Sequence, residues 1–228
     1  QYNYLAVPVI DQEGQLLGIV TVDEIVDVIR EEATEDFLQM AGAGKDREIL
    51  MKSSWDNARS RLPWLFASWV GGVCAAAIIG IFDNTLQSTL ALAAFIPVII
   101  GMGGNIGTQT STLVVRGLAT GRVNVGNNIN IIFKEIRVGL ILGILYGLLL
   151  GLFAIMSFVD ISPYLGLVVG LGIACSMLIA TAFGSLVPLL LHRMDIDPAI
   201  ATGPFVTTSI DILGVTLYFV IANIFLPV

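Results

Sequence analysis

Five long apolar stretches fill most of this 228-residue chain. They cover about residues 62–82, 87–116, 135–158, 163–191 and 198–226, and each offers the ~20 residues with which an α-helix crosses ~30 Å of hydrocarbon. Only helices fit, because apolar runs this long are not barrel strands. The pattern predicts five transmembrane helices. Glycines at every fourth position from Gly139 to Gly151, with Gly166 and Gly170, predict close helix contacts.

The first sixty residues follow a different pattern. Two β-branched runs at 4–10 and 16–22 flank the turn "DQEGQ" and predict a pair of strands. A helix is expected at 23–32, and an amphipathic helix interrupted near Gly42 and Gly44 at 33–60. The strand pair and first helix are too small to hold a core alone. Because the chain also starts at Gln1 rather than Met, we expect it to belong to a longer protein.

These patterns define the predicted fold class. It is an all-α integral membrane domain of five transmembrane helices per subunit, preceded by a partial α+β fragment. The expected boundaries are 1–30 for the fragment, 31–61 for a connecting helix and 62–228 for the transmembrane domain.

Composition and charge agree with a membrane protein. Hydrophobic residues make up 56% of the chain, charged residues only 13%, and the mean hydropathy is +0.88. Residues 1–58 contain 12 of the 18 acidic residues and four basic ones. If the spans alternate, every later basic residue falls on one side, which predicts a cytoplasmic N-terminus and an external Val228. These residues are Arg59, Arg61, Arg116, Arg122, Lys134, Arg137 and Arg193.

One carboxylate, Asp211 in "VTTSIDILGVTLYF", stands deep in an apolar span, near the middle of 198–226. An ionised group at the bilayer centre costs at least ~2.5–3.5 kcal/mol, so such acids are functional by default. The alternative is a carboxylate that simply bonds to a neighbouring helix. Three residues with hydroxyl groups precede Asp211, namely Thr207, Thr208 and Ser209. Two glycines, Gly203 and Gly214, lie before and after it. These groups favour a cation or proton site.

The second span is also unusual. Pro97 and four glycines occur within eleven residues of "FIPVIIGMGGNIGTQTSTLVVRG", which predicts a break in the helix. Irregular backbone at membrane depth is tolerated where it lines a water-filled cavity. An uncharged polar stretch follows, and it is interpreted either as pore lining or as polar contacts between helices. It comprises Asn105, Thr108, Gln109, Thr110 and Ser111.

The candidate ligands are all oxygens. That set suits hard cations such as Mg²⁺, Ca²⁺ or Mn²⁺ and argues against Zn²⁺ or Cu⁺. A two-fold dimer would bring two Asp211 carboxylates together and match a divalent charge. Asp197 before Pro198 fits a helix cap and also an acid at a cation pathway's mouth. No nucleophile–base pair stands out, so an enzyme is not expected.

Acidic residues also crowd the helical stretch before the membrane. Several are like-charge pairs four residues apart, which destabilise a helix mildly unless counter-ions bind. The cluster is therefore either a solvated face or a sensor of divalent cations. Its members are Asp23, Glu24, Asp27, Glu31, Glu32, Glu35 and Asp36.

Two membrane segments closely resemble motifs of the MgtE magnesium channel/transporter family. They are "GMGGNIGTQTSTLVVRGLATG" (101–121) and "DPAIATGPFVTTSIDILGV" (197–215). Residues 5–29, "LAVPVIDQEGQLLGIVTVDEIVDVI", resemble the second half of a CBS domain, and residues 31–42 resemble the start of that family's plug helix. The resemblance extends over essentially the whole chain.

The resemblance implies a homodimer in the bacterial inner membrane, with a Mg²⁺ pore on its two-fold axis. Asp211 matches the acid that holds hydrated Mg²⁺ with help from Thr207, and Asp197 matches an acid near the inner mouth. We expect Asn105, Gln109, Gly203 and Gly214 to line the pore. Cytosolic Mg²⁺ would close it by binding to acids of the CBS and plug regions, which match Asp27, Glu32, Glu35 and Asp36.

Membrane lipid and Mg²⁺ are the other implied partners, and no nucleic acid is expected. ATP is a further partner of complete CBS pairs, but Glu24 stands where CBS domains often carry the aspartate that holds the ribose.

Three functions follow from the sequence, and the first is favoured. It is a Mg²⁺-selective channel gated by cytosolic Mg²⁺. The alternative is an ion-coupled secondary transporter of Co²⁺, Mn²⁺ or Ni²⁺, with Asp211 as a proton, Na⁺ or metal site. The third is a membrane sensor that transports nothing.

Overall fold

A two-stranded hairpin opens the chain. The computed structural model describes residues 4–43, 51–123, 128–158, 162 and 164–226. Strand β1 (Ala6–Ile10) pairs antiparallel with β2 (Leu16–Thr21), and the Asp11 carboxylate accepts backbone N–H bonds within the turn. Most apolar side chains of both strands are exposed. This is expected of a fragment too small to enclose a core.

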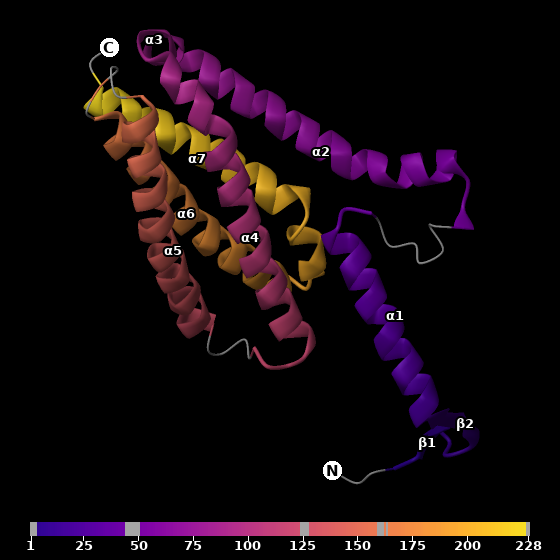
Figure 1. The fold of residues 1–228 in the computed structure, drawn as a ribbon. Coiled ribbons are helices and arrows are strands. Elements are labelled where there is room, and N and C mark those ends of the chain that lie inside the picture. Colours follow the sequence, from indigo (N-terminus) through magenta and orange to yellow (C-terminus); the bar gives the residue numbers. More distant parts are fainter. Residues whose placement is uncertain (1–3, 44–50, 124–127, 159–161, 163, 227–228) are drawn as a thin grey trace.

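Helix α1 (Val22–Met40) follows β2 directly and extends away from the other helices (Figure 1). Thr21 and Glu24 form a capping box, in which each side chain accepts a hydrogen bond from the other residue's backbone N–H. The helix unites the predicted helix at 23–32 with the first part of the connecting helix. It ends at Met40, and Gly42 follows with a φ of 68° that suits glycine, while the Ala43 N–H donates to the Leu38 carbonyl. Gly44, the other predicted interruption, lies outside the described residues.

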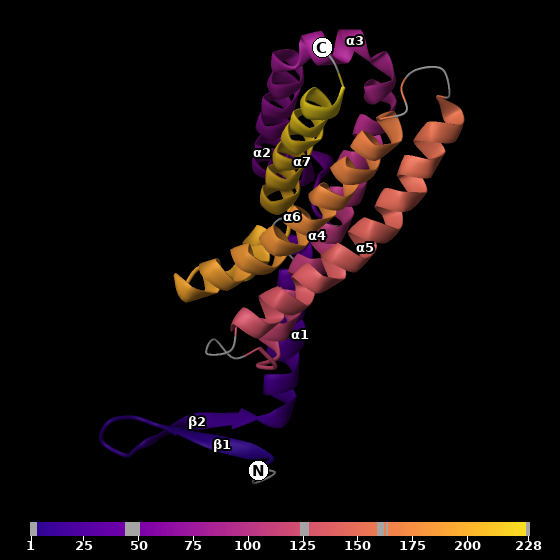
Figure 2. The ribbon, with the colours of Figure 1, turned by 90° about the vertical axis from the view of Figure 1, so that its left-hand side faces the viewer.

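Helix α2 (Ser54–Ile81) begins before the predicted start of the first span, because Ser53 caps it. It lies beside α7 (Pro204–Phe225), as Figure 2 shows, and most of its side chains are exposed. Gly71 provides the close contact between the two helices, since a side chain there would overlap Thr208. The first span therefore packs along only one side.

The predicted break in the second span is wrong. Helix α4 (Ile96–Ala119) is continuous, and it is preceded by the short helix α3 (Asp83–Ser88) and the 3-10 helix η2 (Leu90–Phe95). Pro97 falls in the first turn of α4, where its missing N–H breaks no helical bond. Gly103 and Gly107 instead permit close packing, because Cβ atoms there would collide with Ser176 and Ile210.

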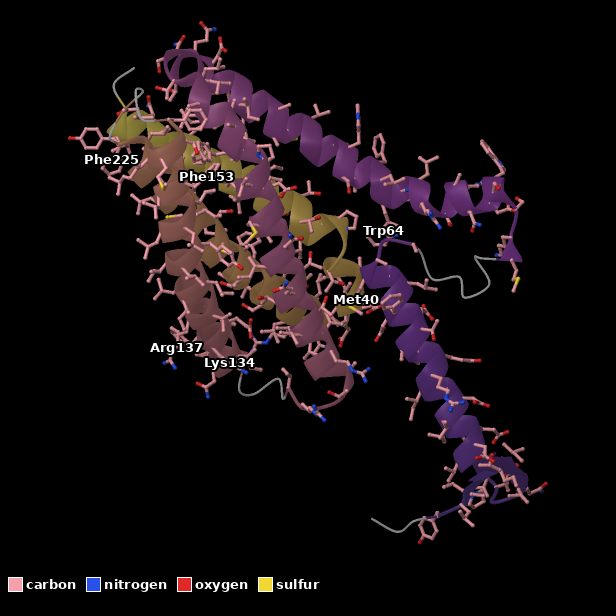
Figure 3. The ribbon with its side chains drawn as sticks, viewed as in Figure 1. Met40, Trp64, Lys134, Arg137, Phe153 and Phe225 are labelled. Carbon is pink, nitrogen blue, oxygen red and sulfur yellow. The ribbon has the colours of Figure 1, made fainter. Side chains whose placement is uncertain are left out.

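Helices α5 (Asn128–Ser157) and α6 (Leu165–Arg193) form the tightest pair. A Cβ atom at Gly151 would stand 2.7 Å from the Gly166 carbonyl oxygen, and one at Gly147 would stand 2.8 Å from the Gly170 carbonyl oxygen. The two backbones thus touch along the predicted glycine positions, which confirms that prediction. Lys134 and Arg137, labelled in Figure 3, lie near the beginning of α5, at the end of the bundle opposite Phe153 and Phe225.

The last span is shorter than predicted. Asp197 caps a separate 3-10 helix, η4 (Pro198–Ala201), and α7 starts only at Pro204. The apolar core lies among η2, α4, α6 and α7, where Tyr218 is fully buried and donates its hydroxyl to the Leu92 carbonyl at 3.1 Å. Among the described residues, five helices are long and apolar enough to cross a membrane, which confirms the predicted fold class.

Candidate cation site

Asp211 is the eighth of the 22 residues of α7, rather than the midpoint of a longer helix. Its side chain is half-buried, and its Oδ1 atom is buried without a hydrogen-bond partner among the residues that the structure describes. On one side lies Gly104 of α4, where a Cβ atom would stand 3.7 Å from Oδ1. A carboxylate oxygen that lacks a donor is costly in an apolar setting. Asp211 is therefore the primary candidate for binding a ligand.

Two of the hydroxyls that precede Asp211 bond to their own helix. Thr207 donates to the Pro204 carbonyl at 3.3 Å, and Ser209 donates to the Phe205 carbonyl at 2.8 Å. Each hydroxyl oxygen still carries lone pairs that can accept from water or contact a cation. Thr207, one turn before Asp211, is positioned to assist in this way.

A polar strip runs along α4 beside Asp211. Asn105 and Gln109 are exposed, and the half-buried Thr108 donates to the Gly104 carbonyl at 2.9 Å. The strip faces away from the packed side of α4, where Gly103 and Gly107 are buried. In a membrane such amides need water or another protein surface, because lipid offers them no hydrogen bonds.

The two glycines expected to line the pore are buried in this structure. A Cβ atom at Gly214 would stand 2.8 Å from the Ser176 hydroxyl on α6. A Cβ atom at Gly203 would stand 3.6 Å from the carbonyl oxygens of both Gln39 and Met40, at the end of α1. Neither glycine therefore belongs to the exposed strip of Asn105 and Gln109.

The end of α1 packs on the segment that precedes α7. The Gln39 side chain, only 1% exposed, donates from Nε2 to Oδ2 of Asp197 at 2.9 Å, and its own Oε1 is buried without a partner among the described residues. Gly42 fits between Pro204 and Trp64; Figure 3 shows Trp64 beside Met40, near the end of α1. Sequence reasoning missed Gln39. The available signal was a polar residue one turn after Asp36, just before the helix end.

Asp36 lies one turn before Gln39 and, like Gln39, interacts with Asp197. Burial raises the pKa of the Asp36 carboxyl, and the negative charges of Asp197, Glu32 and Glu35 raise it further, while Arg116 acts in the opposite direction. Deprotonated Asp36 therefore repels Asp197 across the contact between α1 and η4. A divalent cation would relieve that repulsion.

The other predicted regulatory acids differ in exposure. Asp27 and Glu32 are exposed, whereas Glu35 is half-buried like Asp36. Asp27 approaches Arg30 at 3.8 Å in an exposed ion pair. Within the described ranges no group of three His, Cys, Asp or Glu side chains could hold a metal ion. The structure thus brings Asp36 to Asp197 but leaves Asp27 apart.

A second buried acid was not predicted. Glu135 is the eighth residue of α5 and only 8% exposed, and it accepts a hydrogen bond at 3.1 Å from the buried Thr110 hydroxyl of α4. The sequence pattern placed Glu135 at the edge of a span that starts at 135. The helix starts at Asn128, so Glu135 lies within the span rather than at its edge.

Five membrane-spanning helices and a carboxylate beside an exposed polar strip define a multi-pass membrane protein with a candidate cation site. Residues 96–221 match the model of the MgtE family, which is described as a divalent cation transporter. This match covers more than half of the chain. The chain belongs to the MgtE family, as its motifs predicted.

Three curated relatives extend the match to the whole chain, and each is named magnesium transporter MgtE. The Bacillus subtilis protein is 38% identical over 226 residues, the Enterococcus faecalis protein 39% over 228, and the Thermus thermophilus protein 36% over 228. Each alignment covers 99% of this chain but only 49%, 49% and 50% of the respective relative. The chain therefore spans about half the length of the curated relatives it matches.

Proposed function

We propose that this chain carries Mg²⁺ across the membrane as part of a homodimer, with two Asp211 carboxylates facing each other across the two-fold axis. The observation that carries the proposal is the buried Oδ1 atom of Asp211, which lacks a donor beside the exposed amides of Asn105 and Gln109. The names of the curated relatives support Mg²⁺ as the transported ion.

A dimer accounts for the exposed strip. In a single protomer Asn105 and Gln109 would face lipid, which cannot bond to their amides. Across a water-filled pathway the same groups would face water and a second copy of themselves. Two carboxylates supply the charge that neutralises one divalent ion, as Coulomb attraction favours.

The ligand chemistry favours an ion that keeps its water. Mg²⁺ dehydrates reluctantly and commonly binds through one or two carboxylates while retaining several waters. Asp211 can accept hydrogen bonds from those waters, and Asn105, Gln109 and Thr207 can assist as polar groups on the same pathway. Direct coordination by a full cage of protein oxygens is not required.

Regulation by cytosolic Mg²⁺ completes the proposal. With the N-terminal segment in the cytoplasm, α1 would lie at the inner mouth, where its end packs on Asp197 and Gly203. Mg²⁺ bound near Glu32, Glu35 and Asp36 would offset their repulsion with Asp197 and hold α1 in place. Low cytosolic Mg²⁺ would release it and open the pathway.

Ion flux into liposomes tests the function. We expect Mg²⁺ uptake to require Asp211, to fall when internal Mg²⁺ is raised, and to compete with Mn²⁺, Co²⁺ and Ni²⁺. Recordings from planar bilayers should show unitary currents, which a channel produces. Uptake that strictly follows a proton or Na⁺ gradient, without unitary currents, would instead establish the coupled transporter.

A further inference from the structure

Glu135 of α5 lies where the α5–α6 pair meets α4. It continues the glycine side of α5 one turn before Gly139, whose missing side chain makes room for Thr181 of α6. Helix α5 otherwise packs mainly on α6, and Figure 2 shows it on the far side of the bundle from α2. Its carboxylate nevertheless reaches α4, where it accepts the Thr110 hydroxyl at 3.1 Å.

Thr110 itself is fixed from two sides. It is 2% exposed, and a Cβ atom at Gly184 of α6 would stand 3.1 Å from the Thr110 Cβ atom and 2.6 Å from the Gly107 carbonyl oxygen. Glu135 therefore binds Thr110 at the point where α4 touches the α6 backbone. The bond connects the scaffold pair, α5 and α6, to α4.

The same side of α4 positions the residue next to Asp211. Gly107 lies one turn before Thr110, and it leaves the space that the Ile210 side chain fills. Gly103 leaves similar space, with 3.2 Å from its would-be Cβ atom to Ile210 Cγ2. An axial shift of α4 would move both glycines past Ile210 and would move Gly104 past Asp211.

We infer that Glu135 is a positioning residue, which holds α4 in register through Thr110 and so fixes the environment of Asp211. In lipid, helices gain no hydrophobic force from one another and depend on packing and interhelical hydrogen bonds. The small residues on this side of α4 pack closely but do not by themselves fix the register of α4. The carboxylate–hydroxyl bond fixes the register, because it joins one atom of α5 to one atom of α4.

The test compares variants that remove the bond with variants that retain it. Glu135→Leu and Thr110→Val abolish it, whereas Glu135→Gln keeps an acceptor oxygen and Thr110→Ser keeps the hydroxyl. Ser185→Ala is the matched control, since Ser185 is equally buried but donates only to the Ala182 carbonyl of its own helix. Each purified protein is studied by hydrogen exchange of the α4 amides and by Mg²⁺ and Mn²⁺ uptake in liposomes.

We expect Glu135→Leu and Thr110→Val each to speed amide exchange around Gly104 roughly tenfold and to lower the Mg²⁺-to-Mn²⁺ uptake ratio about threefold or more. The double variant should be no worse than either single one, because both remove the same bond. Glu135→Gln, Thr110→Ser and Ser185→Ala should stay within about twofold of the unchanged protein. If Glu135→Leu fails to fold, Thr110→Val alone carries the comparison.

Two results would overturn the inference. Loss in Glu135→Gln as large as in Glu135→Leu would mean that the charge or its proton matters, not the acceptor. Lower thermal stability with an unchanged uptake ratio and unchanged α4 exchange would mean a merely structural role. The uptake ratio rests on the proposed function, but the exchange measurement does not, so failure of Asp211 as the ion site would be seen separately.

Discussion

Two acids of the membrane helices, Asp211 and Glu135, occupy the same position in their helices and have opposite surroundings. Asp211 and Glu135 are each the eighth residue of α7 and α5. Glu135 is enclosed and receives a hydroxyl bond from Thr110, whereas one oxygen of the half-buried Asp211 has no donor among the described residues. The depth of an acid in a span therefore does not define its role; the partners that the fold supplies do.

The same contrast extends to the two sides of α4. One side is sealed against α6 and α7 by Gly103, Gly107 and Thr110, and the other presents Asn105 and Gln109. Glu135 contacts the sealed side and Asp211 lies beside the open one. A helix can thus pack as scaffold on one side while it offers a polar surface on the other.

The same chemical change at the two acids should give the largest difference. We expect Asp211→Asn to lower Mg²⁺ uptake roughly 100-fold, because hydrogen bonds to a charged group contribute ~1.5–3 kcal/mol and a dimer would lose two such groups. Glu135→Gln, which keeps its acceptor oxygen, should stay within about twofold. Uptake in liposomes measures both, and size-exclusion chromatography confirms assembly. Equal losses in the two variants would erase the distinction between the acids.

A carboxylate with a protein donor also occurs where α1 meets η4, because Gln39 donates to Asp197. Gln39→Leu removes that donor, at a cost of about 1.5–3 kcal/mol for a bond to a charged group. We therefore expect roughly tenfold more Mg²⁺ uptake at high internal Mg²⁺, because α1 is held less firmly. Thr34→Val is the control, since the exposed Thr34 hydroxyl donates only to the Arg30 carbonyl of α1. Unchanged inhibition in Gln39→Leu would argue against this contact as a latch.

Glycine substitutions distinguish the two sides of α4 by stability. Gly107→Ala should destabilise the protein by about 1–3 kcal/mol, because the new methyl group overlaps Ile210 in a packed interior. Gly101→Ala has nothing within 4 Å of its Cβ position and should be neutral or slightly stabilising. Thermal unfolding followed in detergent measures both variants. A similar loss at Gly101 would mean that the open side is covered.

The smallest expected effect concerns pH. Burial, with the nearby charge of Asp197, raises the pKa of the Asp36 carboxyl above its ordinary 3.8, so the docked position of α1 binds the proton more tightly than the released one. Docking should be strongest below that ordinary value and weaken as pH rises through the raised pKa. A fluorophore pair on α1 and η4, followed without Mg²⁺, should report this decline. Asp36→Asn should remain docked throughout, and an identical pH profile in that variant would contradict the assignment.

Much of this protein could be predicted from its sequence. Long apolar runs fix five membrane helices, because only a helix satisfies its own backbone in lipid, and this prediction was confirmed. The glycines from Gly139 to Gly151 predicted a tight helix contact for the same local reason, since the absence of side chains lets backbones approach. The motifs around Asn105 and Asp211 identified the family, which the comparison then showed.

Only the tertiary structure decided what each polar group contacts. Pro97 and the glycines of α4 predicted a break, but their neighbours on α6 and α7 turned Gly103 and Gly107 into packing positions. Glu135 is 25 residues from its partner Thr110, and Gln39 is 158 residues from its partner Asp197. No local sequence pattern therefore relates the members of either pair. Sequence determines which segments enter the membrane, because that depends on each segment's own transfer energy. Which acid receives a hydrogen bond, and which keeps an oxygen without a donor among the described residues, depends on atoms contributed by other helices.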